Sequence, residues 1–242
     1  MKKRKITMLL ILLFTVAAAF CLWFDFNAYE SQSRTIPCED DDIIFSITTF
    51  NGNSESKPFV KCLGHTWLSI DNQSGHSVYL KDHEIKPGEM ITFSVWAVSD
   101  LPGLLFNLES AYISAYDRYA GRKSLNVNIE EEQLKSIEAY IDRSNKWTLS
   151  KNCSYWSVHL WNEVVDEAFR LKTQTLFYTP KRLEKYFCEF DGVEGDKDFS
   201  RADIFSATVT ASERSCNYVH ESYEKQARAL GFIHRVGRFR PL

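Results

Sequence analysis

Two residues far apart in the chain have the types and local settings of a nucleophile and its base. The first, Cys153, follows Asn152, a good helix N-cap, so the sequence predicts that Cys153 lies on the first turn of a helix running to about Phe169. Unpaired backbone N–H groups and the positive end of the helix dipole favour a thiolate at that position. The alternative is a structural cysteine, because most cysteines behave as small buried hydrophobic residues.

The second residue, His65, begins a segment of strand character and comes directly after Gly64, which lets another backbone pass close by. An imidazole beside a thiol can take up its proton and hold an ion pair, which is the arrangement of cysteine hydrolases. The alternative is a surface or capping histidine. That alternative suits most of the other histidines, namely His76, His83, His159, His220 and His234.

The segments that must position this pair are read as strands first and helices afterwards. Strands are predicted at residues 43–50, 65–70, 77–80, 90–98 and 124–129. Helices are predicted at residues 104–119, 130–144, 153–169, 181–190 and 212–230. The strand at 77–80 is expected to return as the hairpin partner of 65–70, because residues 71–75 have turn chemistry throughout. This order indicates an α+β domain with a mostly antiparallel sheet packed against helices.

The first 24 residues predict an N-terminal transmembrane or signal helix. Four cations at positions 2–5 precede an uncharged apolar run from Ile6 to Phe24. The run comes close to the ~20 residues that span a bilayer, and the cations place its start in the cytoplasm. We favour an uncleaved single-pass anchor with the domain outside the cytoplasm. The alternative is a signal peptide cleaved after Ala17–Ala19, which would release a secreted protein.

The rest of the chain divides into a linker at 25–42, a main domain at 43–190 and a C-terminal helical extension at 191–242. Beyond residue 24 the chain has 25 basic and 32 acidic residues, a net charge of −7, which argues against nucleic acid as a partner. The sequence has neither a Cys-x-x-Cys motif nor a histidine pair at i, i+4 with a carboxylate. It therefore predicts neither a metal site nor a cofactor.

Taken together, residues Gly64–Ile70 and a helix opened by Asn152–Ser154 resemble the circularly permuted branch of the papain-like fold. That branch includes permuted NlpC/P60 hydrolases and lecithin:retinol acyltransferase-like proteins, in which the histidine strand precedes the nucleophile helix. The chain from about residue 43 to 187 also resembles a group of uncharacterised exported bacterial proteins. The stretches that carry this second resemblance are residues 106–110, 119–122, 147–149 and 179–180.

The resemblance implies that Cys153 is the nucleophile, that His65 is general base and acid, and that a third polar residue orients the imidazole. Five residues remain open for that third role: His76, Ser77, Asp82, His83 and, as an outside choice, Glu109. The backbone N–H of Cys153 is expected to contribute to an oxyanion hole.

The implied function is an exported Cys–His thiol hydrolase that cleaves an amide or peptide bond through an acyl-enzyme, with cell-wall peptide as the first candidate. One alternative is a lipid-directed acyltransferase or esterase of the same fold. Another is a non-catalytic binding or immunity protein. The expected partners are a peptide, amide or lipid substrate and the membrane. The oligomeric state stays open.

Five cysteines follow the leader, and an odd number leaves at least one thiol unpaired in an oxidising compartment. Bridges from Cys38 to Cys62 and from Cys188 to Cys216 are conceivable, and they would leave Cys153 free. The alternative is that some or all of these thiols stay reduced and buried.

The leader gives the first testable prediction. We expect the intact protein to stay in the membrane fraction after a high-salt wash, because an apolar helix is not released by screening charges. Cell fractionation and N-terminal sequencing check this. Protein that is released by salt and begins after Ala19 would show cleavage instead.

Overall fold

The computed structural model describes residues 34–36, 42–52, 64–98, 101–116, 119–148, 150–172 and 178–202. The predicted leader and the predicted helix at 212–230 lie outside these residues. Within the described ranges, no helix is long and apolar enough to cross a membrane.

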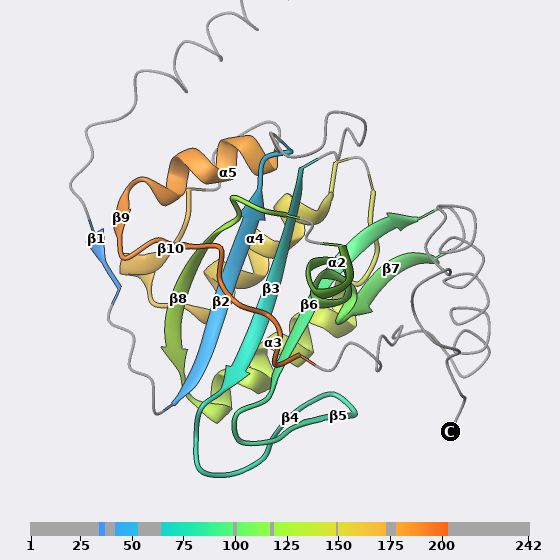
Figure 1. The fold of residues 1–242 in the computed structure, drawn as a ribbon, viewed down its shortest axis with the longest axis vertical. Helices are drawn as coiled ribbons and strands as arrows, with labels where there is room; N and C mark the ends of the chain where they lie inside the picture. The colour runs from blue at the N-terminus through green and yellow to red at the C-terminus, as the bar shows by residue number, and fades with distance from the viewer. Residues whose placement is uncertain are drawn as a thin grey trace, which may run out of the picture. The chain divides into compact units, whose positions relative to one another are not determined.

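The centre of the fold is a six-stranded antiparallel sheet in the order β10-β8-β2-β3-β6-β7 (Figure 1). Its strands are β2 (Ile43–Phe50), β3 (His65–Asn72), β6 (Met90–Val98), β7 (Leu101–Phe106), β8 (Lys123–Ile129) and β10 (Glu194–Gly195). Two small pairs lie outside it: β4 (Val78–Leu80) with β5 (His83–Ile85), and β1 (Arg34–Thr35) parallel to β9 (Phe190–Asp191). Every residue of β2 and β3 is buried, so both faces of the sheet are covered there.

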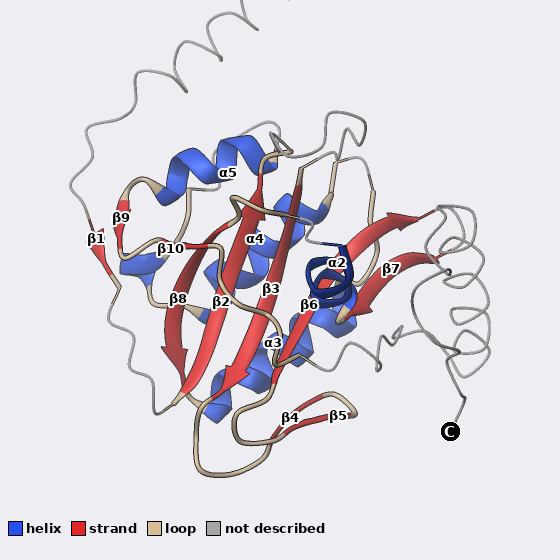
Figure 2. Ribbon diagram, viewed as in Figure 1, coloured by secondary structure: helices blue, strands red, loops and turns tan. Residues whose placement is uncertain are grey.

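Helices α3 (Glu131–Arg143) and α4 (Cys153–Val164) cover one face of the sheet, as Figure 2 shows in blue behind the strands, whereas α2 (Leu108–Tyr116) lies in front of the sheet. The described helices are α2 (Leu108–Tyr116), α3 (Glu131–Arg143), α4 (Cys153–Val164) and α5 (Pro180–Phe187), with a short 3-10 turn at Glu167–Phe169. Aromatic side chains join α4 to the sheet. Phe45 of β2 stacks on Trp161 at 5.4 Å between ring centroids, and Phe93 of β6 meets Trp156 edge-on at 6.2 Å.

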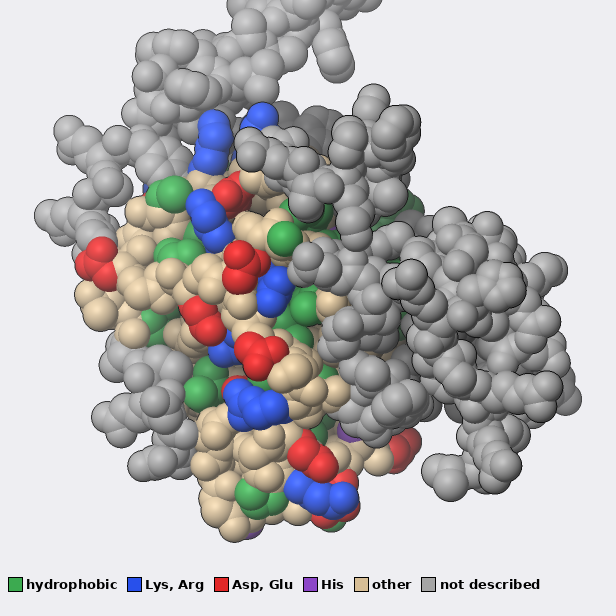
Figure 3. Space-filling view, in the orientation of Figure 1, with side chains coloured by type: hydrophobic (Ala, Val, Ile, Leu, Met, Phe, Trp, Pro, Cys, Tyr) green, Lys and Arg blue, Asp and Glu red, His purple; other side chains and the backbone are tan. Residues whose placement is uncertain are grey.

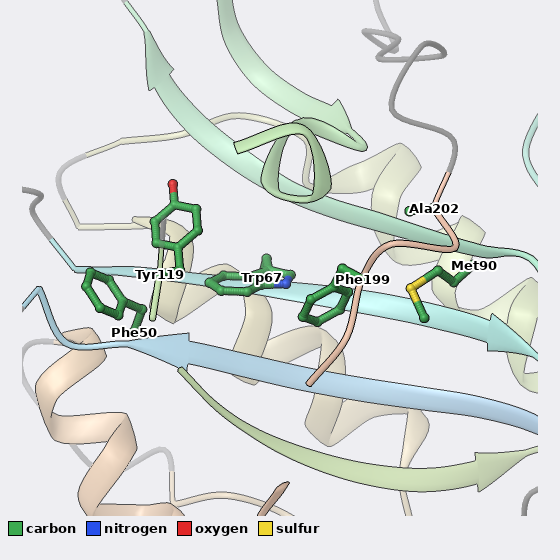
Figure 4. Packing of buried hydrophobic residues seen from close by; sticks show 6 residues of the cluster. All are labelled: Phe50, Trp67, Met90, Tyr119, Phe199 and Ala202. Atoms are coloured by element: carbon green, nitrogen blue, oxygen red, sulfur yellow. The ribbon is translucent and has the colours of Figure 1, made fainter. Parts of the chain in front are cut away.

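The opposite face is covered by the segment after β10, residues 196–202, which we call the C-terminal strap. It crosses in front of β2 and β3 (Figure 1). Its Phe199 is fully buried and packs on Trp67 of β3 with ring centroids 5.8 Å apart. These two side chains belong to a row of buried residues that follows β3 from Phe50 to Met90 (Figure 4).

Two arginines hold the strap in place. Arg122 donates from Nε to the carbonyl of Lys197 at 2.9 Å and from Nη2 to the carbonyl of Asp196 at 3.0 Å. Arg201 donates from Nη1 to Asp71 of β3 at 2.9 Å, and its Nη2 bonds the other carboxylate oxygen. The strap is therefore attached to the sheet by polar as well as apolar contacts.

Basic and acidic side chains are interspersed on the strap side of the molecule, as Figure 3 shows for the coloured atoms. Several of them are paired with each other. Lys123 lies 2.8 Å from Glu184, and Lys197 lies 3.2 Å from Glu194. No large patch of a single charge sign is seen among the described residues on this face.

The α+β class and the antiparallel sheet are confirmed. The predicted strands at 43–50 and 90–98 have the observed bounds, and the helix at 130–144 corresponds to α3. The glutamate at its start forms a capping box with Gln133, which explains the clear beginning of this helix. The start of α5 after Thr179 is also as predicted, with proline in the first turn.

Two predictions about strand pairing and type were wrong. The segment at 77–80 pairs with β5 and not with β3, whose partners are β2 and β6. The side chain of Asn72 explains the turn away from β3, because it donates to the carbonyls of both His76 and Ile85 at 2.8 Å. The segment 104–119, predicted as one helix, is the end of β7 followed by α2. A short apolar run does not distinguish a buried strand from a helix by its periodicity.

Two helices end earlier than predicted. The helix of Cys153 ends at Val164, and the extended backbone of Val165 separates it from the 3-10 turn. The helix predicted to reach residue 190 ends at Phe187, because Phe190–Asp191 pairs with β1 as a strand.

The packing of the strap predicts a large loss of stability for Phe199→Ala. Removing a fully buried phenylalanine leaves a cavity against Trp67, and we expect the free energy of unfolding to fall by about 3–5 kcal/mol. Chemical denaturation of the purified domain measures it. Tyr79→Ala is the matched control, since Tyr79 is 58% exposed and its loss should change little. Equal effects of the two substitutions would contradict the assignment of the strap to the core.

Candidate active site

The start of β3 is fixed by a close approach of three segments at Gly64. A Cβ atom at this position would lie 2.6 Å from the carbonyl oxygen of Phe50 and 2.9 Å from Cβ of Pro180. Contacts that short do not occur, so only glycine allows the end of β2 and the start of α5 to meet here. The next residue, His65, is thereby held opposite Phe50 in the β2–β3 register.

The start of α4 is fixed by its cap, as the sequence predicts. The side chain of Asn152 accepts from the backbone N–H of Tyr155 at 3.0 Å and donates to the carbonyl of Tyr178 at 2.8 Å. Cys153 is the first residue of the helix and is partly exposed. Its thiol therefore lies at the positive end of the helix dipole.

The structure brings Cys153 and His65 together through a side-chain hydrogen bond. Burial alone would lower the pKa of His65, but the charge of Cys153, that hydrogen bond and Glu109 raise it to about 9. Burial would likewise raise the pKa of Cys153. The charge and hydrogen bond of His65, with the backbone N–H groups of Thr66 and Ser154, lower it instead. Both shifts favour the thiolate and imidazolium forms of the pair.

Glu109, in the first turn of α2, holds the imidazole from its other side. Its Oε1 accepts from Nε2 of His65 at 2.9 Å, which leaves Nδ1 as the ring nitrogen for Cys153. The same oxygen accepts from Nε1 of Trp96 at 2.9 Å, and Oε2 accepts from the hydroxyl of Thr92 at 3.2 Å. Glu109 is fully buried, so these donors take the place of water around the carboxylate.

Aromatic rings surround His65 and restrict its orientation. The ring centroid of Trp96 lies 4.2 Å away, that of Trp67 lies 5.8 Å away and nearly parallel, and that of Tyr119 lies 6.1 Å away. Apolar walls of this kind reduce the local dielectric constant and strengthen the interaction between thiolate, imidazolium and carboxylate.

Of the five candidates for the third residue, Glu109 is the one that the structure places in a hydrogen bond with His65. His76 instead bonds Glu131 at the surface, at 2.6 Å, and His83 lies against the ring of Phe106 at 4.4 Å. Ser77 precedes β4, and Asp82 lies in the turn between β4 and β5. The sequence signal for Glu109 is a glutamate in the first turn of a helix. The prediction of one helix over residues 104–119 started that helix too early and so did not place Glu109 in its first turn.

His159, read from the sequence as a residue outside the site, lies away from the Cys153 thiol on α4. Its ring centroid is 4.0 Å from that of Tyr155 and 5.7 Å from that of Tyr178. Burial lowers its pKa, which keeps it neutral. It belongs to an aromatic contact between α4 and the segment before α5.

Both cysteines in the described part of the chain carry free thiols. Cys153 is one, and Cys188, which is exposed, is the other. The Cys188 thiol donates to the carbonyl of Glu184 at 3.6 Å. Cys38, Cys62 and Cys216 themselves lie outside the described residues.

Among the described residues, no group of three or more His, Cys, Asp and Glu side chains is arranged to hold a metal ion. Comparisons of the chain with protein-family models, with curated proteins and with solved structures give no match.

The coupled pair predicts that Cys153 is reactive at neutral pH. Its rate of alkylation should reach half-maximum well below the ~8.5 of an ordinary cysteine, because His65 stabilises the thiolate. His65→Ala should move that midpoint back up. Peptide mass spectrometry after timed alkylation separates Cys153 from Cys188, whose exposed thiol serves as the internal control. A midpoint that does not respond to His65→Ala would rule out the coupling.

Proposed function

We propose that this protein is a thiol hydrolase with Cys153 as nucleophile, His65 as general acid and base, and Glu109 as the residue that orients the imidazole. The observation that supports it is the chain of contacts from Glu109 through the imidazole of His65 to Cys153. A nucleophile, a base and an orienting group in this order are the parts of a catalytic triad.

The reaction follows from these contacts. The thiolate of Cys153 attacks the carbonyl carbon of an amide, and the carbonyl electrons move to its oxygen. The backbone N–H of Cys153 has no acceptor within its helix, because it is the first residue of α4, and it is our candidate donor to that oxygen. The imidazolium of His65 then gives its proton to the leaving amine as the C–N bond breaks. An acyl-enzyme and a free amine result.

The second half of the reaction reverses the roles of the imidazole. Neutral His65 takes a proton from water, and the hydroxide formed attacks the thioester carbonyl. The C–S bond breaks, the carboxylic acid leaves, and the thiolate–imidazolium pair is restored. Glu109 keeps the ring in one orientation throughout, because Trp96 and Thr92 hold the carboxylate in turn.

We further propose that the fold is the circularly permuted papain-like type and that the substrate is a peptide or amide, with cell-wall peptide the first candidate. The chain order supports the fold assignment, since the histidine strand β3 precedes the nucleophile helix α4. The predicted leader supports an extracytoplasmic substrate. A binding protein without chemistry has no need for a buried carboxylate and a buried imidazole, whose removal from water is costly.

Acyl-enzyme formation tests the reaction directly. We expect the wild-type protein to gain the mass of an acyl group at Cys153 when incubated with activated esters and with peptide substrates, including cell-wall peptides. Cys153→Ala should gain none, and Cys188→Ala should behave as the wild type. Intact-protein mass spectrometry after acid quench is the measurement. A reactive Cys153 that forms no acyl-enzyme with any of these substrates would contradict the hydrolase proposal.

The pKa of His65 predicts the upper limit of the active pH range. Catalysis needs the protonated ring, so kcat/KM should rise as Cys153 ionises and fall again near pH 9, where His65 loses its proton.

Glu109→Gln should move that upper limit down, because the negative charge that raises the pKa of His65 is lost. It should also reduce kcat/KM by ~10²-fold. Glu131→Gln is the matched control, since it alters a carboxylate–histidine pair on the surface. An unchanged upper limit in Glu109→Gln would remove Glu109 from the proposed triad.

A further inference from the structure

A chain of buried hydroxyl groups runs beneath Cys153. The hydroxyl of Ser154 on α4 lies 2.8 Å from that of Thr66 on β3, which lies 3.2 Å from that of Thr49 on β2. The Thr49 hydroxyl bonds the carbonyl of Pro180 at the start of α5, at 3.2 Å. All three hydroxyl residues are at most 1% exposed. The chain thus joins the two strands and two helices that meet at the site.

The final acceptor gives the chain a direction. A carbonyl oxygen only accepts, so Thr49 donates its single hydroxyl proton to Pro180. Thr66 must then donate to Thr49, and Ser154 to Thr66. Each hydroxyl donates once, so the order of donors is the same all along the chain.

Thr66 and Ser154 also interact with Cys153 through their backbones. The backbone N–H groups of Thr66 and Ser154 both donate to the sulfur of Cys153. One of these donors belongs to β3 and the other to α4. The hydrogen bond between their side chains therefore fixes the spacing of the two backbone donors that hold the sulfur.

We infer that Thr66 and Ser154 are positioning residues for the nucleophile, and that their side-chain hydrogen bond keeps two backbone N–H groups directed at the Cys153 sulfur. This inference rests on the proposed function of Cys153. Without the bond, strand and helix can shift by the few tenths of an ångström that weaken one of the two donors. The thiolate then loses stabilisation, and a larger fraction of Cys153 is protonated at neutral pH.

Docking of the helix on the sheet does not depend on this bond. Apolar contacts already hold α4 against β2 and β6, through Phe45 on Trp161 and Phe93 on Trp156. Replacement of Thr66 by the isosteric valine preserves the volume and removes the hydroxyl. A pH profile of Cys153 then separates positioning from general stability, because a purely structural defect would not shift the midpoint of a folded protein.

The experiment compares the pH dependence of Cys153 alkylation in Thr66→Val, Ser154→Ala and the double variant. We expect each single variant to raise the midpoint by about half a pH unit or more. The double variant should go little further than the larger single effect, because each substitution by itself already breaks the bond between Thr66 and Ser154. Thr66→Ser keeps the hydroxyl and should stay near the wild type.

Thr48→Val is the matched control, because the hydroxyls of Thr48 and Ser124 form an equally short buried pair, also 2.8 Å, on the opposite face of the sheet. A wild-type midpoint at the value of a free thiol would overturn the proposed function itself. A lowered wild-type midpoint that Thr66→Val and Ser154→Ala leave unchanged would overturn this inference alone, and so would an equal shift in Thr48→Val. If Thr66→Val fails to fold, Ser154→Ala decides between these outcomes by itself.

Discussion

The free-energy cost of removing charged groups from water constrains how the elements around Cys153, His65 and Glu109 are arranged. Each ion taken from water costs several kcal/mol unless other groups replace its hydration. Here a carboxylate, an imidazolium and a thiolate lie in series, and the two buried ones at one end, Glu109 and His65, are sealed by aromatic rings. Neighbouring elements supply the replacements: an indole and a hydroxyl from β6 for Glu109, and backbone N–H groups from β3 and α4 for the sulfur.

The same constraint explains why secondary-structure ends, and not their middles, meet at this place. The starts of α2 and α4 bring helix dipoles and unpaired backbone N–H groups to the buried charges, and the start of β3 brings His65. Gly64 allows this convergence, because any side chain there would collide with the end of β2. Gly64 thus contributes to the site only through the space that its missing side chain leaves.

Local signals in the sequence predicted what depends on local structure. The cap of α4 at Asn152 and the strand that begins at His65 follow from short-range preferences. Glu109 could not be assigned in the same way. Its place beside His65 depends on β7, which was misread as helix, and on the long-range pairing of β3 with β6. The strap was also not foreseen, because its contacts with Trp67 and Asp71 span more than a hundred residues.

The late position of the strap in the sequence affects folding during synthesis. A chain is synthesised from its N-terminus, and domains fold in that direction. The face of β3 that bears Trp67 receives its cover from Phe199, among the last described residues, so an aromatic surface stays open until translation has passed this point. Contacts of such long sequence separation also form slowly. A nascent chain that ends before Phe199 therefore lacks one of the aromatic side chains that cover Trp67 in the folded protein.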